Sequence, residues 1–159
     1  MKVKSGIGFD AHRFKNGRKL IIGGVQIESE TGLDGHSDAD VLIHAIIDSL
    51  AGPALGRDIG NIFPDSDPAY KNIDSRVLLK NTVSMIAEFG FEISSVDAEI
   101  IAQKPKMAPH IPDMRKTLAS ILNIPLEDIT IKATTTEKMG FTGRGEGIAA
   151  LAVSTIIRQ

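Results

Sequence analysis

A carboxylate and an imidazole, Asp10 and His12, lie two residues apart in the segment GIGFDAHRF (residues 6–14). Alternate residues of a β-strand point to the same face, so these two side chains would lie side by side. They would either face water or converge on something that they share. The chain has no cysteine, so a transition-metal site would depend on His, Asp and Glu ligands of this kind.

A third candidate ligand, His44, falls within the apolar stripe that begins at Val41 in VLIHAIIDSL. A lone histidine in such a stripe is more often a buried structural residue than a ligand, and an Asp-x-His pair is common by chance. Two ligands from a strand and one from a helix would together leave a fourth position open, as catalytic zinc sites do. Spacing alone leaves the structural and the zinc interpretations open.

The segment DGHSDAD (34–40) has residues suited to phosphate. Gly35, His36 and Ser37 directly precede a predicted helix, where free N–H groups and the positive end of the helix dipole attract anions. In KATTTEK (132–138), the threonine hydroxyls, two lysines and Glu137 could contact phosphate and Mg²⁺. A solvated strand end would give the same pattern.

Two loops rich in polar residues or glycine are also candidates. The acidic loop DIGNIFPDSD (58–67) could be a solvated turn or could bind the hydroxyls of a sugar or polyol. GFTGRGEG (140–147) lacks the spacing of a P-loop or a dinucleotide-binding fingerprint, and it could be a flexible loop.

Length and composition are those of one ordinary globular domain, residues 1–159, with 42% hydrophobic and 24% charged residues. A net charge of −2 gives no general electrostatic reason to expect nucleic acid or an acidic membrane as a partner. No segment approaches the roughly 18 apolar residues of a membrane span. We expect a cytoplasmic protein, or one of an organelle matrix after removal of a transit peptide.

The pattern of the chain predicts strands and helices that alternate around one sheet, hence an α/β or α+β class. A capping box from Ser37 to Asp40 would start the first helix, and Gly52-Pro53 would end it. The last apolar run suits either element, and its β-branched residues favour a strand. The expected strands are about 3–13, a hairpin in 18–27 turning at Gly23-Gly24, 91–103, 128–136 and 148–158; the expected helices are about 41–52, 75–88 and 112–123, with a loop at 56–73.

Five segments in order along the chain resemble the 2-C-methyl-D-erythritol 2,4-cyclodiphosphate synthase family: GFDAHRF, GLDGHSDADVLIHAIIDSLAG, DIGNIFPDSD, IIAQKPKMAPHIPDMR and IKATTTEKMGFTGRGEGIAA. The resemblance implies an α+β subunit with one mixed sheet packed by helices on one side. It also implies a homotrimer, with the sheets around a central axis and active sites between subunits. The implied activity is a lyase of the non-mevalonate isoprenoid pathway that forms a cyclic diphosphate and CMP from a cytidine-diphosphate substrate.

The resemblance also implies a role for individual residues. Asp10, His12 and His44 would hold Zn²⁺ with an open fourth position, and Glu137 would anchor Mg²⁺ or Mn²⁺ on the substrate diphosphate. His36 and Thr135 would stabilise the transition state, and Ser37 would contact a phosphate. Asp10, His12, His36, Thr135 and Glu137 would also touch the substrate. The other implied substrate-binding residues are Asp58, Ile59, Gly60, Phe63, Pro64, Asp65, Ser66, Asp67, Ala102, Gln103, Lys104, Pro105, Lys106, Met107, Ala108, Thr134, Thr136, Phe141 and Arg144.

Phe141 and Arg144 match positions at the end of an apolar cavity on the trimer axis. One hypothesis is that this cavity binds an isoprenoid diphosphate, with the diphosphate on Arg144. The alternative is that Arg144 pairs with Glu146, or with a carboxylate of a neighbouring chain.

Two other functions remain open for the whole chain. One is a zinc-dependent phosphohydrolase that uses the same three ligands to activate water, although no further general base is evident beside them. The other is a non-catalytic trimeric module that binds a nucleotide or isoprenoid around a structural metal.

Overall fold

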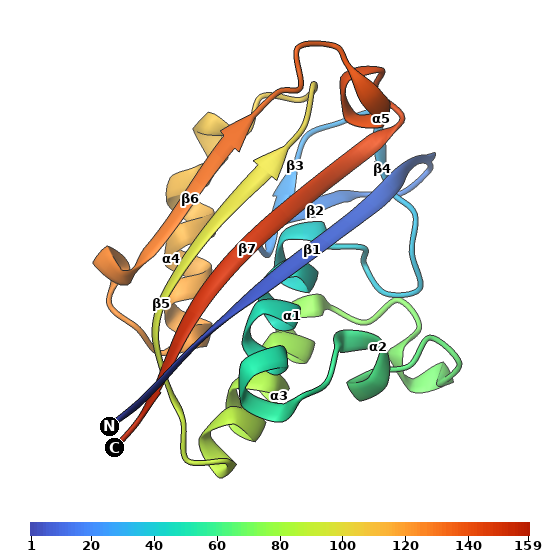
Figure 1. Ribbon diagram of the computed structural model, residues 1–159. Helices are drawn as coiled ribbons and strands as arrows, with labels where there is room; N and C mark the ends of the chain where they lie inside the picture. Colours follow the sequence, from blue (N-terminus) through green and yellow to red (C-terminus); the bar gives the residue numbers. More distant parts are fainter.

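The computed structural model describes residues 1–159 and contains a five-stranded mixed sheet with its helices on one face (Figure 1). The strand order is β4-β1-β7-β5-β6, and only β5 and β6 pair in parallel. This architecture confirms the predicted α+β class. The strands are β1 (Lys2–Asn16), β2 (Leu20–Ile22), β3 (Val25–Ile27), β4 (Thr31–Leu33), β5 (Glu92–Ile101), β6 (Ile129–Thr134) and β7 (Gly147–Arg158); the helices are α1 (Val41–Leu55), α2 (Ile59–Ile62), α3 (Ser75–Glu88), α4 (Ile111–Leu122) and α5 (Gly140–Gly143).

Most predicted elements are confirmed. The last run is a strand, β7, which pairs along its length with β1 on one side and β5 on the other. The predicted hairpin is present as β2 and β3, which form a separate two-stranded sheet. The short strand β4 was not predicted, and short helical turns interrupt the expected loop at 56–73.

The predicted end of the first helix is wrong. Helix α1 continues through Pro53 and stops only at Gly56, which has a left-handed backbone with φ of 67°. A proline inside a helix removes one backbone hydrogen bond, but a helix with enough buried surface tolerates that loss. The predicted capping box is also not formed, because Asp40 rather than Ser37 is the N-cap and accepts from the Ile43 N–H at 3.0 Å.

The Asp40 carboxylate joins α1 to the β2–β3 hairpin. Besides capping the helix, it accepts hydrogen bonds from the backbone N–H groups of Gly23 and Gly24, at 2.9 and 2.7 Å. Complete burial raises the pKa of Asp40 to about 6; the charge of Asp38 adds to this rise and the three N–H donors oppose it. One buried side chain thus fixes where the loop before α1 crosses the hairpin.

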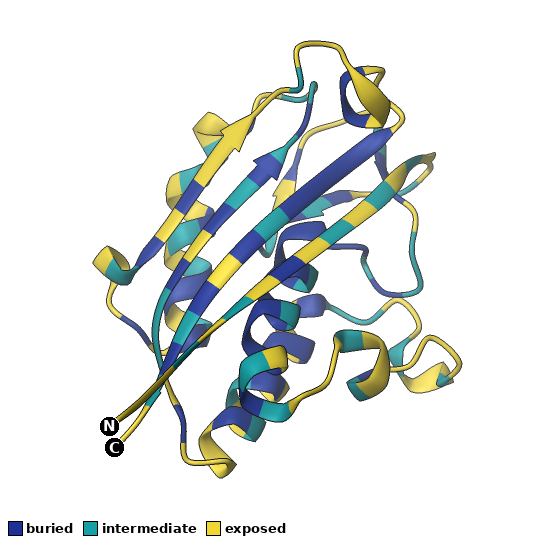
Figure 2. Ribbon diagram, in the orientation of Figure 1, coloured by how far each residue is buried: buried dark blue, intermediate teal, exposed yellow.

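Helix α1 forms the centre of the core and lies directly against β1 and β7 (Figure 2). Glycines on β1 make this close approach possible. A Cβ atom on Gly8 would lie 1.8 Å from the Ala45 carbonyl oxygen, and one on Gly6 would lie 2.1 Å from that of Ser49. Because residues of the same parity share a face of a strand, Gly6, Gly8, Asp10 and His12 all face the helices.

The apolar residues between them therefore point to the other side of the sheet. Ile7 and Phe9 are 69% and 56% exposed, and Val153 of β7, which pairs with Ile7, is exposed as well. This open apolar face has no helix over it in the single chain (Figure 1). No helix of the chain combines the length and apolar character that a bilayer crossing would need.

We expect Gly8→Ala to lower the free energy of unfolding by about 3 kcal/mol, because the new methyl group overlaps the backbone of α1. Gly52→Ala is the matched control: Gly52 lies in helix α1, which packs on Gly8, and no atom lies within 4 Å of the added Cβ. Better helix propensity should make that variant more stable by about 0.5–1 kcal/mol. Denaturant unfolding of the three proteins measures both effects, and equal stabilities would contradict the proposed contact.

Candidate metal centre and active site

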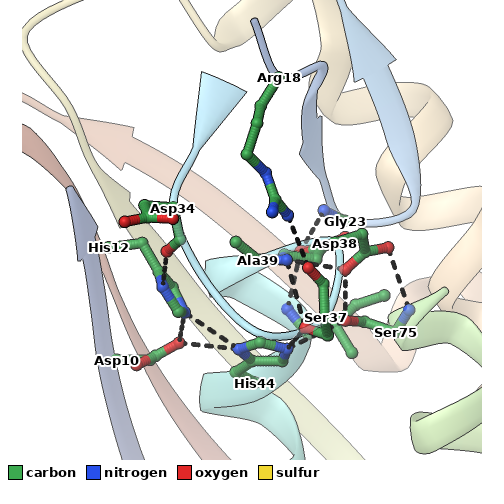
Figure 3. Close-up of polar contacts among 12 residues, drawn as sticks. Asp10, His12, Arg18, Gly23, Asp34, Ser37, Asp38, Ala39, His44 and Ser75 are labelled. Atoms are coloured by element: carbon green, nitrogen blue, oxygen red, sulfur yellow. Dashed lines mark hydrogen bonds and ion pairs between the residues drawn. The ribbon is translucent and has the colours of Figure 1, made fainter. Parts of the chain in front are cut away.

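Three side chains from β1 and α1 converge on one point (Figure 3). The Asp10 Oδ2 atom lies 2.7 Å from His12 Nε2 and 3.0 Å from His44 Nδ1, and the two nitrogens are 3.2 Å apart. The three side chains are partly buried, with exposed fractions of 27% for Asp10, 18% for His12 and 11% for His44. The triad predicted from sequence is thus brought together.

The chemistry of this triad fits a divalent cation. His12 Nδ1 lies 2.7 Å from the Asp34 carbonyl oxygen, to which it can only donate, so the neutral ring leaves a lone pair on Nε2. That lone pair faces the Asp10 carboxylate, an arrangement that is unfavourable unless a proton or a metal ion lies between them. Imidazole nitrogen and carboxylate oxygen are ligands that Zn²⁺ accepts, and three of them leave a position for substrate.

The ionisation of the triad reflects the same proximity. Burial acts to raise the pKa of Asp10, but the hydrogen bonds and charges of His12 and His44 outweigh it and lower the pKa to about 2. Burial acts to lower the pKa of His12, and its hydrogen bond and charge interaction with Asp10 raise the pKa instead. The carboxylate is therefore ionised throughout the neutral range, as a metal ligand must be.

A pocket of about 200 Å³ opens beside the triad. The predicted phosphate residues His36 and Ser37 line it, and His36 Nε2 donates to the Asp67 carbonyl oxygen at 3.2 Å. From the predicted acidic loop, four residues reach the pocket: Ile59, Gly60, Phe63 and Asp65. Asp58 caps α2 instead, with its carboxylate on the Asn61 N–H at 2.8 Å, and Pro64, Ser66 and Asp67 do not line the pocket.

The loop that carries His36 and Ser37 is held from outside by Arg18. The guanidinium donates to the carbonyl oxygens of Gly35 and Ser37, at 3.1 and 2.6 Å (Figure 3). Within the loop, Ala39 adopts a left-handed backbone with φ of 58° and is completely buried. A non-glycine residue in this region is strained, which indicates that the surrounding contacts impose the loop conformation.

The other predicted substrate residues lie elsewhere in the chain. The segments 102–108 and 134–137 follow β5 and β6 and are joined by the Ala102 N–H, which donates to the Thr134 carbonyl oxygen at 3.0 Å. Strands β7 and β5 separate the end of β6 from β1, a spacing of about 14 Å at 4.8 Å per strand. Thr135 and Glu137 are exposed, and neither lines the pocket beside the triad.

A second, wider groove of about 1120 Å³ is lined by residues 103–106 of the first segment, by Lys138 just after the second, and by residues 28–31 and 143–145. Its basic side chains are Lys104, Lys106, Lys138 and Arg144, and Gln103 accepts from the Lys138 N–H at 3.2 Å. Arg144 forms an ion pair with Glu146 at 2.8 Å, as the alternative to a diphosphate ligand predicted. The Phe141 ring is 41% exposed on the short helix α5.

Sequence reasoning missed several residues that build the site. Ser75 begins α3 and contacts His44, Arg18 holds the loop, and Tyr70 and Leu78 line the pocket. Each comes from a segment distant from the motif that it supports. A fifth missed residue, Asp38, accepts hydrogen bonds from Ser75; it lies within DGHSDAD, a segment that the sequence analysis had singled out.

We expect Arg18→Met to free the loop from 35 to 39, because two carbonyl oxygens lose their charged donor. Amide hydrogen exchange in this loop should accelerate about 10-fold, equivalent to roughly 1.4 kcal/mol. Lys19→Met, at the exposed neighbouring cation, is the matched control and should leave exchange unchanged. If both variants exchange like the wild type, Arg18 does not hold the loop.

Comparisons with known proteins agree with these features. The model of the YgbB family matches residues 3–157. A protein of Bacteroides fragilis named 2-C-methyl-D-erythritol 2,4-cyclodiphosphate synthase is 56% identical over 158 residues, 99% of each chain. A protein of the same name from Parabacteroides distasonis is 55% identical over 159 residues, 100% of this chain and 99% of the relative.

Solved structures share the fold. The bifunctional IspDF of Campylobacter jejuni superposes with a TM-score of 0.93 at 41% identity, over 98% of this chain and 42% of that longer chain. IspF of Plasmodium falciparum, solved as a CDP complex, has a TM-score of 0.85 at 32% identity, covering 99% and 97% of the two chains. From the family match over 3–157, the near full-length relatives and the fold, the chain belongs to the YgbB family.

Proposed function

We propose that this chain is a cyclodiphosphate synthase that converts 4-diphosphocytidyl-2-C-methyl-D-erythritol 2-phosphate to 2-C-methyl-D-erythritol 2,4-cyclodiphosphate and CMP. The observation that carries the proposal is the Asp10–His12–His44 triad, which opens on the pocket that His36 and Ser37 line. The name of the relatives, which are 55–56% identical to this chain over nearly its full length, supports the same activity. The reaction belongs to the non-mevalonate isoprenoid pathway.

The reaction is an intramolecular phosphoryl transfer. An oxygen of the 2-phosphate forms a bond to the β-phosphorus, and the bond from that phosphorus to the bridging oxygen breaks, so that CMP leaves with the electron pair. Such reactions depend on positioning and on the neutralisation of charge more than on covalent catalysis. The protein must hold two mutually repelling phosphates within bonding distance.

We assign the first metal as Zn²⁺, held by Asp10, His12 and His44. When bound, zinc would supply positive charge and could polarise a phosphoryl oxygen of the substrate. Ser37 can donate its hydroxyl to a phosphate, and His36, whose Nε2 donates to the Asp67 carbonyl oxygen, lies at the wall of the same pocket. We propose His36 as a catalytic residue that aligns the reacting groups.

Thr135 and Glu137 would act from a second element, the end of β6. Glu137 is an exposed carboxylate, with a left-handed φ of 53°, next to Thr135, whose hydroxyl accepts the Glu137 N–H at 3.3 Å. Oxygen ligands suit Mg²⁺ or Mn²⁺, which would neutralise the substrate diphosphate. Thr135 would then contribute a hydroxyl to the transition state, with Thr134 and Thr136 beside it.

The separation of the two residue groups supports a site shared between subunits of a homotrimer. In one chain the triad lines its pocket, and Thr135 and Glu137 at the end of β6 lie outside that pocket. The open sheet face with Ile7, Phe9 and Val153 presents the apolar area that an obligate interface requires. Association through this face would surround a central axis with three sheets and allow the two groups to meet across an interface.

The remaining recognition is proposed from position. The segment from Ala102 to Ala108 would bind the cytidine, and the loop from Asp58 to Asp67 would hold the erythritol and ribose. The IspF of Plasmodium falciparum was solved as a CDP complex, which supports a cytidine diphosphate ligand here. An isoprenoid diphosphate near Phe141 and Arg144, a cytoplasmic location and a single domain over 1–159 stay predictions.

We expect wild-type protein to release CMP and the cyclic diphosphate, and His12→Ala or His44→Ala to abolish turnover and most bound zinc, since each removes one of three ligands. His110→Ala, outside both cavities, is the matched control. Product analysis with elemental mass spectrometry measures both effects. A shortened phosphate ester in place of the cyclic product would favour a phosphohydrolase, and no turnover at all a binding module.

Glu137→Gln should weaken the dependence on Mg²⁺ or Mn²⁺ while zinc stays bound, because only the hard oxygen ligand is neutralised. A Mg²⁺ titration of activity measures the change, and Glu146→Gln is a control carboxylate beyond β6. We expect the activation midpoint to rise about 10-fold for Glu137→Gln alone. An unchanged curve would make Glu137 a solvated loop residue.

Mixing two inactive variants tests whether a site is shared. If the triad and Thr135 act from neighbouring chains, His12→Ala and Thr135→Ala should complement each other after joint refolding. About a quarter of the interfaces in randomly mixed trimers would combine two intact halves. No recovery, with mixed trimers confirmed by native mass spectrometry, would place the whole site within one chain.

A further inference from the structure

The outer ring nitrogen of His44, Nε2, points away from the triad toward two hydroxyls (Figure 3). It lies 2.9 Å from Ser75 Oγ and 3.1 Å from Ser37 Oγ. A neutral histidine carries its hydrogen on one nitrogen and offers a lone pair on the other. His44 can therefore ligate a cation through Nδ1 only while its hydrogen lies on Nε2.

The polarity of the Ser75 hydroxyl is set by Asp38. Ser75 Oγ donates to Asp38 Oδ1 at 2.5 Å, and the Ser75 backbone N–H donates to Oδ2 at 3.0 Å. An ionised carboxylate can only accept, and a serine hydroxyl has a single hydrogen. Because that hydrogen is engaged by Asp38, Ser75 presents only a lone pair to His44. The partner of this lone pair must be an N–H.

We propose that Asp38 and Ser75 are positioning residues that hold His44 in its Nε2–H form and thereby set the metal affinity of the triad. The pair joins the loop before α1 to the first residue of α3, and Ser75 is completely buried. Groups that hydrogen-bond to the outer nitrogen of a ligating histidine fix its tautomer and orientation, and their loss typically lowers metal affinity by about 10–100-fold.

The same arrangement leaves the Ser37 hydroxyl available to substrate. Ser37 Oγ accepts the Ala39 N–H at 3.2 Å and shares the His44 Nε2–H, so both contacts use its lone pairs. Its own hydrogen then remains for a ligand in the pocket that Ser37 lines. The Asp38 carboxylate would thus set the hydrogen-bond direction of the Ser75 hydroxyl, the His44 imidazole and the Ser37 hydroxyl.

Two variants remove or reverse the hydrogen bond that Ser75 accepts from His44 Nε2–H. Ser75→Ala removes the acceptor. The Asp38 carboxylate accepts from the Ser75 hydroxyl, the Ser75 N–H and the Asp40 N–H, and Asp38→Asn leaves only one oxygen for these three donors. Where the new amide donates to Ser75 Oγ, the hydroxyl hydrogen turns to His44 Nε2 and the ring hydrogen moves to Nδ1. Ser84→Ala is the matched control, since it removes an exposed hydroxyl from the same helix, where it bonds only to the Lys80 carbonyl oxygen.

The inference rests on the proposed metal centre but not on the proposed reaction, so its test needs no substrate. Nitrogen-15 NMR of the metal-free proteins, at a pH well above the ordinary histidine pKa of about 6.5, reports which ring nitrogen of His44 carries hydrogen. Competition titration with a chelator gives the Zn²⁺ affinity of the same samples.

In the metal-free protein the Asp10 carboxylate, 3.0 Å from Nδ1, also attracts the ring hydrogen of His44, so the two tautomers compete. We expect a larger fraction of the Nε2–H form in wild type and Ser84→Ala than in Asp38→Asn. Zn²⁺ affinity should fall about 10-fold in Ser75→Ala and up to about 100-fold in Asp38→Asn. Equal fractions of the Nδ1–H form in wild type and Asp38→Asn, or Zn²⁺ binding by both variants within two-fold of Ser84→Ala, would overturn the inference while leaving the metal centre intact. A wild type that binds no Zn²⁺ would overturn both.

Discussion

Helix α1 approaches strand β1 so closely that no Cβ atom fits between them at Gly6 or Gly8. The metal triad depends on this contact, because His44 is on the helix and Asp10 and His12 continue the same face of the strand. An added Cβ at Gly6 or Gly8 would lie about 2 Å from a carbonyl oxygen of α1, so the helix, and His44 with it, would have to move away from the strand. Backbone-to-backbone packing, rather than any single polar bond, therefore sets the distances in the site.

The same contact reverses the usual distribution of side chains on a strand, in which apolar residues face the helices and polar residues face outward. On β1 the small and polar residues face the helix layer, and the large apolar residues, Ile7 and Phe9, face outward. Because the metal ligands occupy the side of β1 that faces the helices, the apolar side chains of the strand are not covered by those helices. One strand pattern thus places the metal ligands against the helix layer and leaves an apolar face of the sheet exposed in the single chain.

Local patterns were sufficient to predict much of this molecule. The alternation in β1 and the apolar stripe of α1 marked Asp10, His12 and His44 as candidates, because each belongs to a regular element, and the family resemblance then implied them as metal ligands. The support of the site was not predictable, since Ser75 reaches His44 only through the packing of α3 on α1. The end of α1 was mistaken for a similar reason: burial stabilises the helix through Pro53, against a local rule.

The two ends of the chain leave the sheet as neighbours, since Lys2 of β1 pairs with Arg158 of β7 (Figure 1). Asp10 lies eight residues further along β1, about 26 Å away at the rise of an extended strand. A protein module joined to either end would extend away from the metal ligands and leave α1 and its loop untouched.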